Sequence, residues 1–205
     1  TFFSLGSQVT INSGAESAFT TLLTNEANGQ LSITDQNLTV DSGTIGASTA
    51  NQLAATTSGI VTASIDTTAT IEGLKTLTGT NAYTIVINSG DASALASDLI
   101  AIDNGTSIVV NVSAVTNITG NVTELVALYA SSGLTGLGDE ALFASGDLSV
   151  SQANILNNLT TGIVTGSIDS NERVSSLISL TGTGNAYTIT ISANDAIGIT
   201  ASEFN

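Results

Sequence analysis

The sequence Gly-Ile-Val-Thr-Ala-Ser-Ile-Asp at residues 59–66 returns 103 positions later, with one substitution, as Gly-Ile-Val-Thr-Gly-Ser-Ile-Asp at residues 162–169. A second pair follows: Leu-Thr-Gly-Thr-Asn-Ala-Tyr-Thr-Ile at residues 77–85 and Leu-Thr-Gly-Thr-Gly-Asn-Ala-Tyr-Thr-Ile at residues 180–189. The second copy carries one extra residue, Gly184, which we expect to lie in a loop. A chain that reuses one module at a fixed spacing is typical of a stacked repeat protein.

The composition supports a folded protein with an unusual core. Of the 205 residues 41% are hydrophobic but only 4% are aromatic, and Trp, Met, Pro, His and Cys are absent. The core must therefore be built from Ile, Val, Leu and Ala. Such small and β-branched side chains suit thin, regularly stacked layers better than one large globular core. The absence of cysteine excludes disulfides and thiolate metal sites.

The charge balance excludes one class of partner. Lys75 and Arg173 stand against 17 acidic residues, which gives a formal net charge of −15. Binding to nucleic acid requires Lys and Arg to neutralise phosphates, so this function is excluded, and anionic membrane surfaces are disfavoured for the same reason. No apolar run approaches the roughly 20 residues that span a bilayer, so we expect no membrane insertion.

The order of predicted elements indicates alternating strands and helices. Helices are predicted at residues 71–77, 93–102, 151–159 and 172–180, whereas residues 116–120 are predicted to form a turn. Predicted strands begin near residues 38, 60, 83, 108, 141, 163 and 187. Strands joined by helical crossovers should be parallel, and the crossovers should be right-handed.

Each predicted helix has a single apolar stripe, so it can cover only one face of a sheet. The sequence therefore predicts an α/β solenoid, with parallel strands and short helical crossovers on one face. A parallel β-helix is the alternative, because the helices are short and rich in Ser and Thr. Asn121 and Glu124 have capping-box spacing and predict a helix that begins there.

The repeat pattern divides the chain into two predicted regions. Residues 1–37 fall outside the pattern and are predicted to form an N-terminal cap or assembly segment. Residues 38–205 are predicted to form strand-helix solenoid repeats. Because Thr200 and Glu203 have capping-box spacing near the C-terminus, we expect the repeats to continue beyond residue 205 in a longer protein.

Several phrases resemble a known group of repeats. They include Thr-Thr-Gly-Ile-Val-Thr at 160–165, Leu-Thr-Gly-Thr at 77–80, the glycine-rich run at 129–140, and Leu-Ser-Val-Ser-Gln-Ala at 148–153. Similar repeats occur in very large adhesin-like or S-layer-like proteins of marine bacteria and cyanobacteria, and in phage structural proteins. The resemblance covers roughly residues 38–204. It implies an extracellular or cell-surface location and transfers no catalytic residues.

The residue inventory is poor in catalytic groups. Without His or Cys, the one nucleophile-base pair available is Ser with Lys75, and a lone lysine is usually a solvated charge. Asp139 and Glu140 are adjacent, so in extended chain they point to opposite faces and cannot form a glycosidase pair. Asp66 and Asp169 repeat with the module, which indicates a structural role. We therefore expect no enzyme activity.

Calcium is the one cofactor that this inventory favours, because hard oxygen ligands are abundant. The candidate ligands are Asp91, Asp103, Asp139, Glu140 and Asp147. Neither an Asp-x-Asp-x-Asp loop nor a Gly-Gly-x-Gly-x-Asp repeat is present. Helix caps and turns are the competing explanation for most of these acids, Asp91 and Asp169 among the predicted caps.

Two functional hypotheses follow. The first is an extracellular structural or adhesive repeat protein that self-assembles head to tail into a filament or surface layer, with contacts at residues 2–11 and 186–204. The second is a glycan- or cell-surface-binding module, in which polar side chains on the strand face recognise the ligand. Candidate side chains for such a face are Thr62, Ser64, Thr84 and Thr188.

Overall fold

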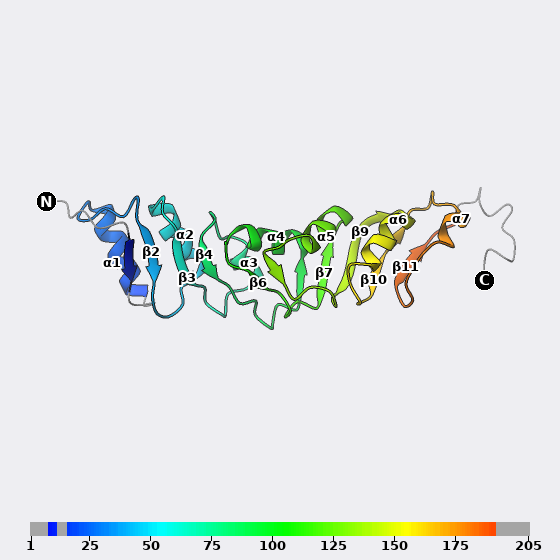
Figure 1. The fold of residues 1–205 in the computed structure, drawn as a ribbon, viewed down its shortest axis with the longest axis horizontal. Coiled ribbons are helices and arrows are strands. Elements are labelled where there is room, and N and C mark those ends of the chain that lie inside the picture. Colours follow the sequence, from blue (N-terminus) through cyan, green and yellow to red (C-terminus); the bar gives the residue numbers. More distant parts are fainter. Residues whose placement is uncertain (1–7, 12–15, 192–205) are drawn as a thin grey trace. The chain divides into compact units, whose positions relative to one another are not determined.

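A computed structural model describes residues 8–11 and 16–191 of the chain (Figure 1). It is an α/β protein with parallel strands and helical crossovers, as the sequence predicts. The chain forms two compact units. The first unit comprises Thr1–Asp91, Asp98–Ala114 and Ser132–Gly136. The second comprises Ala92–Ser97, Val115–Ser131 and Leu137–Asn205.

The first unit contains a parallel sheet in which each strand lies beside the strand that precedes it in the chain. Within the described residues the sheet order is β1 (Gln8–Ile11), β2 (Asn37–Val40), β3 (Val61–Ser64) and β4 (Ala82–Thr84). The crossovers are α1 (Glu16–Ala27), α2 (Ala47–Thr56) and α3 (Ile71–Leu74). Single bridges then join Asn81 to Thr106 and Val86 to Asn111. The short strands β6 (Val110–Asn111) and β8 (Leu134–Thr135) pair with each other, and α4 (Ala96–Asn104) precedes β6.

The second unit also contains a parallel sheet. The sheet has the order β5 (Ser93–Leu95), β7 (Asn117–Gly120), β9 (Ala141–Leu148), β10 (Val164–Ile168) and β11 (Ala186–Ile189). In this sheet β7 pairs with both β5 and β9, although β6 and β8 lie between them in the chain. Its crossovers are α5 (Val122–Tyr129), α6 (Val150–Asn157) and α7 (Val174–Leu177). Apart from β8, which belongs to the first unit, the order of elements from β7 to β11 matches the order from β1 to β4. Each unit holds one copy of the duplicated sequence.

The core of each unit lies between its strands and its helices. Leu38, Val61 and Tyr83 are fully buried on the strands of the first unit, whereas their neighbours Thr62 and Thr84 are exposed. This alternation follows from the two-residue period of a strand. Burial raises the pKa of Tyr83 to about 12, and its hydroxyl donates to the Ala50 carbonyl at 3.2 Å.

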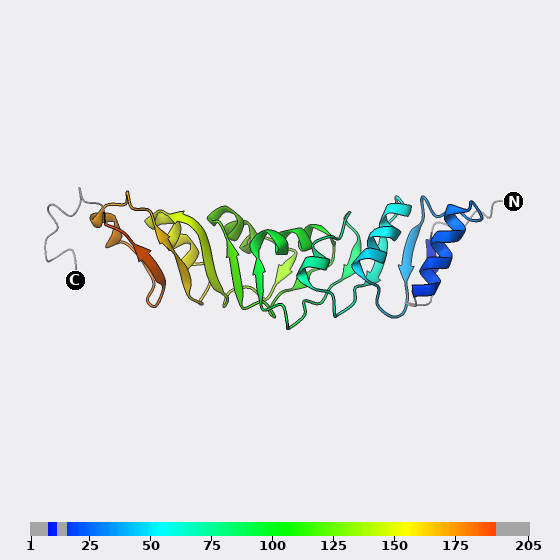
Figure 2. The ribbon, with the colours of Figure 1, turned by 180° about the vertical axis from the view of Figure 1, so that it is seen from behind.

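The helices also pack on one another in chain order. In the first unit α2 contacts both α1 and α3, and in the second unit α5 contacts α6 (Figure 2). The predicted capping box at Asn121 and Glu124 is confirmed, since the Asn121 side chain accepts from the Glu124 N–H and Glu124 accepts from the Asn121 N–H. Ser149 and Gln152 form a second capping box on α6.

The structure corrects several predicted elements. The helix predicted at 93–102 is strand β5 followed by α4, and the turn predicted at 116–120 contains strand β7. The helices predicted at 71–77 and 172–180 shorten to the single turns α3 and α7. The loop position predicted for the extra residue Gly184 is confirmed. Gly184 has φ +94°, in a turn before β11.

Candidate functional site

An asparagine on a helix holds the following loop in both units. Asn51 on α2 donates its amide N–H to the Thr76 carbonyl at 2.7 Å and accepts from the Thr78 N–H at 2.9 Å. Asn154 on α6 makes the same two bonds to the Ser179 carbonyl and the Thr181 N–H, both at 2.8 Å. Each amide therefore satisfies two backbone groups of a loop that has no strand or helix partner of its own.

A second asparagine completes the hydrogen bonding at the beginning of a strand. The Oδ1 atom of Asn81 accepts from the Val61 N–H at 2.9 Å, and Asn185 accepts from the Val164 N–H at the same distance. Each asparagine follows a glycine turn with positive φ, at Gly79 in the first unit. The side-chain amide thus extends the hydrogen bonding between neighbouring strands beyond the strand itself.

A Thr-x-Gly turn before β3 and before β10 brings two neighbouring segments close together. Thr57 Oγ1 donates to the Gln36 carbonyl at 2.6 Å and accepts from the Gly59 N–H at 2.9 Å. Thr160 makes the equivalent bonds to the Glu140 carbonyl at 2.7 Å and the Gly162 N–H at 2.9 Å. Both the threonine and the glycine are therefore needed for local packing.

Thr106 performs a similar task in the first unit with a larger set of bonds. It is buried, and its Oγ1 accepts from the N–H groups of Tyr83 and Ile108 at 3.0 and 3.1 Å. The hydroxyl lies 2.8 Å from the Tyr83 carbonyl, to which it donates.

Replacing Thr106 with valine should therefore lower the free energy of unfolding by about 3 kcal/mol, because two N–H groups lose their acceptor in a buried place. Thr106→Ser keeps the hydroxyl and should cost only about 1 kcal/mol for the lost methyl group. Urea denaturation followed by circular dichroism measures both variants. Equal stability of the two would show that the hydroxyl bonds are unimportant.

Glu140 is the one acidic side chain that is almost completely buried among the described residues, with 1% of its surface exposed. Its Oε2 accepts from the Tyr129 hydroxyl at 2.7 Å and from the Gly138 N–H at 2.8 Å, whereas Oε1 has no partner among the described residues. Burial, together with the hydrogen bond to Glu140, raises the pKa of Tyr129, so the phenol stays a donor. The equivalent position in the first unit is Gln36, whose Oε1 is also buried and without a partner there.

The five predicted calcium ligands fall in both units. Asp91 and Asp103 belong to the first unit, and Asp139, Glu140 and Asp147 belong to the second. Within the described ranges, no group of three or more acidic side chains is close enough to hold a metal ion. Calcium binding stays a prediction from the sequence.

The structure shows the surroundings of four of these acids and of Asp169. Asp91 accepts from the Ile71 N–H at 3.0 Å, at the first residue of α3, whose N-cap is Thr70. Asp103 lies against Gly133, where an added Cβ would meet its carboxylate. Asp139 is exposed while Glu140 is buried, so the two carboxyl groups lie in different environments. Asp169, a predicted helix cap, instead accepts from the Asn171 N–H in a turn.

Lys75, the residue considered as a catalytic base, is held by two carboxylates. Its Nζ lies 2.7 Å from Glu72 and 3.2 Å from Asp98. The hydrogen bond to Glu72 is the main reason why the pKa of Lys75 is raised. A lysine with a raised pKa keeps its proton and is a poor general base.

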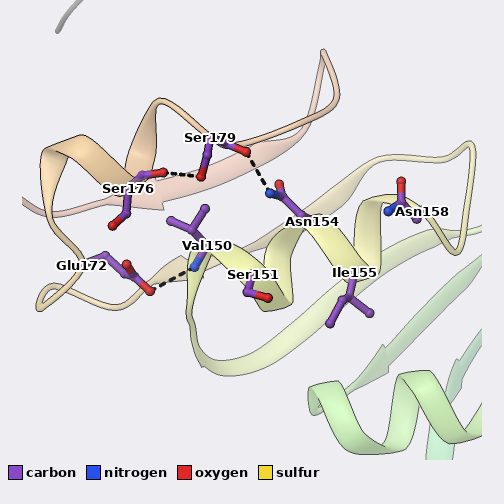
Figure 3. A pocket seen from close by; sticks show the side chains of 8 residues that line it. All are labelled: Val150, Ser151, Asn154, Ile155, Asn158, Glu172, Ser176 and Ser179. Atoms are coloured by element: carbon purple, nitrogen blue, oxygen red, sulfur yellow. Dashed lines mark hydrogen bonds between the residues drawn. The ribbon is translucent and has the colours of Figure 1, made fainter.

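A polar pocket lies between α6 and the segment around α7 in the second unit (Figure 3). It has a volume of about 480 Å³. Its lining includes Ser151, Asn154, Ile155 and Asn158 from α6 and its C-terminal end, and Glu172 and Ser176 from the opposite segment. Glu172 accepts from the Val150 N–H at 3.2 Å at the N-terminal end of α6. A smaller pocket of about 300 Å³ lies between residues 54–60 and 78–81 of the first unit.

Comparison with protein-family models, with curated proteins and with solved structures gives no match to this chain. Among the residues that the structure describes, no helix is long and apolar enough to cross a bilayer.

The sequence does not reveal the roles of Asn51 and Asn154. The one sequence feature that could have indicated these roles is that Asn51 and Asn154 are 103 residues apart, which is the spacing of the duplicated sequence.

Proposed function

We propose that the chain is a structural or adhesive repeat protein of the cell exterior, which assembles head to tail into a filament or surface layer. The observation that supports this proposal is that the two units share a set of side-chain to backbone hydrogen bonds. The repeated bonds of Asn51 and Asn154, and of Thr57 and Thr160, join side chains to the backbone of a neighbouring segment. The feature that the two copies share is therefore a set of structural hydrogen bonds. These bonds hold the fold together and do not form a catalytic arrangement.

A solenoid is the fold that best accounts for this pattern in each unit. Strands β1 to β4 and strands β9 to β11 are sheet neighbours in chain order. Helix α2 contacts α1 and α3, and α5 contacts α6, which supports a helix layer on one side of each sheet. A doubly wound sheet would place helices on both faces. The single helix layer favours coils of strand, turn, helix and turn over a parallel β-helix without helices.

The last described strand supports the assembly part of the proposal. In the first unit, Tyr83 and Ile85 are 0% and 6% exposed, because the segment around Thr106 covers them. The equivalent residues on β11 are Tyr187, which is partly exposed, and Ile189, which is 44% exposed. These core side chains are thus more exposed at β11 than in the first unit, although Tyr187 still donates to the Ala153 carbonyl at 3.3 Å. A further coil would bury their exposed surface. A second copy of the chain is the partner that we propose.

Light scattering and negative-stain electron microscopy of the full chain test this assembly. Particles larger than the monomer are expected, and Ile189→Asp should dissolve them because it places a charge in the contact. Ile60→Asp is the matched control, since Ile60 is 52% exposed in the other unit and should leave assembly intact. Deletion of residues 1–12 should also abolish assembly if they supply the other contact. Persistent monomers in the parent chain would contradict the proposal.

The same microscopy, with and without a chelator, tests the calcium prediction. Disassembly by the chelator, reversed by added calcium, would favour bound ions. Unchanged particles would favour coils held by hydrogen bonds and apolar packing alone.

Recognition of surface glycans is the second candidate function, favoured by one observation. The outward positions of β3, β4 and β11 carry Thr62, Thr84 and Thr188, all exposed and uncharged in a chain of net charge −15. Uncharged hydroxyl groups suit hydrogen bonding to sugars.

A further inference from the structure

We propose that the pocket between α6 and the α7 segment binds a neutral oligosaccharide by direct hydrogen bonding. This inference rests on the glycan-binding candidate function, to which it gives a place in the fold and a class of ligand. It moves the expected contact away from the exposed threonines of the strands. The first unit serves as an internal reference for the second.

The two units keep the same residues where the fold needs them. Asn154 and Ser151 of the pocket correspond to Asn51 and Ser48 of the first unit. In Figure 3 the Asn154 side chain points toward Ser179 and donates to its carbonyl. This bond is equivalent to the one that Asn51 makes to the Thr76 carbonyl in the first unit. This part of the pocket wall is structural in both copies.

The rest of the pocket differs between the units. Asn158, Glu172 and Ser176 take the places of residues with no polar side chain. Those first-unit residues are Ala55, Ala69 and Gly73. Ile155 takes the place of Gln52. The first unit folds without these side chains, although Glu172 also accepts from the Val150 N–H at the beginning of α6. The second unit thus has additional hydrogen-bonding side chains, and one apolar side chain, that line the same pocket.

The chemistry of these groups selects the ligand. The Glu172 carboxyl group uses Oε1 on the Val150 N–H, which leaves acceptor capacity for ligand hydroxyls. The Asn158 amide can both donate and accept, and the exposed side chain of Ile155 offers an apolar surface to the C–H face of a sugar ring. Hydroxyl groups at Ser151 and Ser176 add donors and acceptors. No Lys or Arg lines the pocket, so a phosphate, a sulfate or a uronic acid would meet Glu172 without a counter-charge.

The size of the pocket agrees with more than one sugar ring. Its volume of about 480 Å³ lies in the range of about 300–1,000 Å³ that is usual for small-molecule sites. Glu172 lies at the Val150 end of α6 and Asn158 lies at the other end (Figure 3). The helical rise from Val150 to Asn158 is about 12 Å, longer than one ring. The ligand would therefore lie along α6.

Binding to an array of neutral and acidic glycans, followed by titration calorimetry with the tightest neutral oligosaccharide, tests the proposal on the full chain. The double variant Glu172→Gln with Asn158→Ala should weaken binding at least tenfold. The introduced glutamine can still accept from the Val150 N–H, and alanine is the first-unit residue at the position of Asn158, so circular dichroism and the melting temperature should change little. Unchanged affinity in this variant would show that the pocket is not the binding site.

A matched control separates this inference from the broader function. Thr62→Ala with Thr84→Ala removes hydroxyls from the strand face, which is the competing location for glycan binding. If this variant loses binding while the pocket variant keeps it, the pocket is wrong but glycan recognition stands. If no neutral glycan binds the parent chain, both are wrong. Loss of binding in a chelator would overturn direct recognition in favour of an ion-mediated contact.

Discussion

Replacing Gly162 with alanine is expected to lower the free energy of unfolding by about 3 kcal/mol, and the same change at Gly59 should have a similar effect. An added Cβ at either glycine would lie 2.3 Å from a backbone carbonyl oxygen, that of Glu140 or that of Gln36. The neighbouring atoms are backbone, so no side-chain rotation can relieve the clash, and the segments must separate. Neither glycine has positive φ, so the cost arises from close approach alone.

Urea denaturation followed by circular dichroism measures this loss, and Gly46 supplies the control. An added Cβ at Gly46 has nothing within 4 Å. Gly46 precedes α2 where the equivalent residue before α6 is the capping residue Ser149. Gly46→Ser should therefore stabilise the chain by a few tenths of a kcal/mol. A Gly162→Ala variant as stable as the parent would mean that the two segments are not in close contact.

Replacing Glu140 with alanine is expected to cost about 3 kcal/mol, whereas Glu140→Gln should cost less than about 1 kcal/mol or stabilise the chain. Alanine leaves the Tyr129 hydroxyl and the Gly138 N–H without their acceptor in a buried place. Glutamine keeps one acceptor oxygen and turns the unpartnered Oε1 into an N–H₂ donor. At the equivalent position the Gln36 amide donates to Asp35, so the amide introduced at position 140 can donate to Asp139 in the same way.

The reverse exchange is the matched test. Gln36→Glu removes the amide that donates to Asp35 and places two carboxyl groups side by side, one of them in a site only 7% exposed. It should destabilise the chain by about 3 kcal/mol. Thermal unfolding of the two single variants compares the sites directly. If Glu140→Gln and Gln36→Glu change the free energy of unfolding by the same amount, the two sites do not share a preference for an amide side chain.

The sequence predicts the strands that carry the repeat, because their apolar residues alternate over four or more positions. It does not predict β5, since Leu95, Leu99 and Ile102 have the spacing of a helix. In the structure Leu99 and Ile102 are fully buried on α4, but Leu95 is 49% exposed on a strand. Strand β7 escapes prediction because it has only four residues and lies among polar turn residues. Pairing with the neighbouring β9, which a local pattern does not contain, decides its conformation.

The candidate sites are harder to predict than the strands. The adjacency of Asp139 and Glu140 does not reveal which of the two side chains is buried. That depends on Tyr129, which lies 11 positions earlier, and on the turn at Gly138. The pocket along α6 unites residues from two segments separated by a strand. The role of Glu172 is hidden in the sequence, because it belongs to a stretch whose pattern indicates only a helix.

The asparagine bonds described above have a consequence for how the chain folds. Asn51 reaches residues 25 and 27 positions away, and Asn154 spans the same separations. These bonds join segments that are close in the sequence, and contacts of short sequence separation favour rapid folding. Strands β2, β3 and β4 can each pair with the strand just before them while the chain grows, without waiting for a distant segment. If the units are solenoids, as we propose, unfolding can likewise begin at an end and advance by one coil at a time.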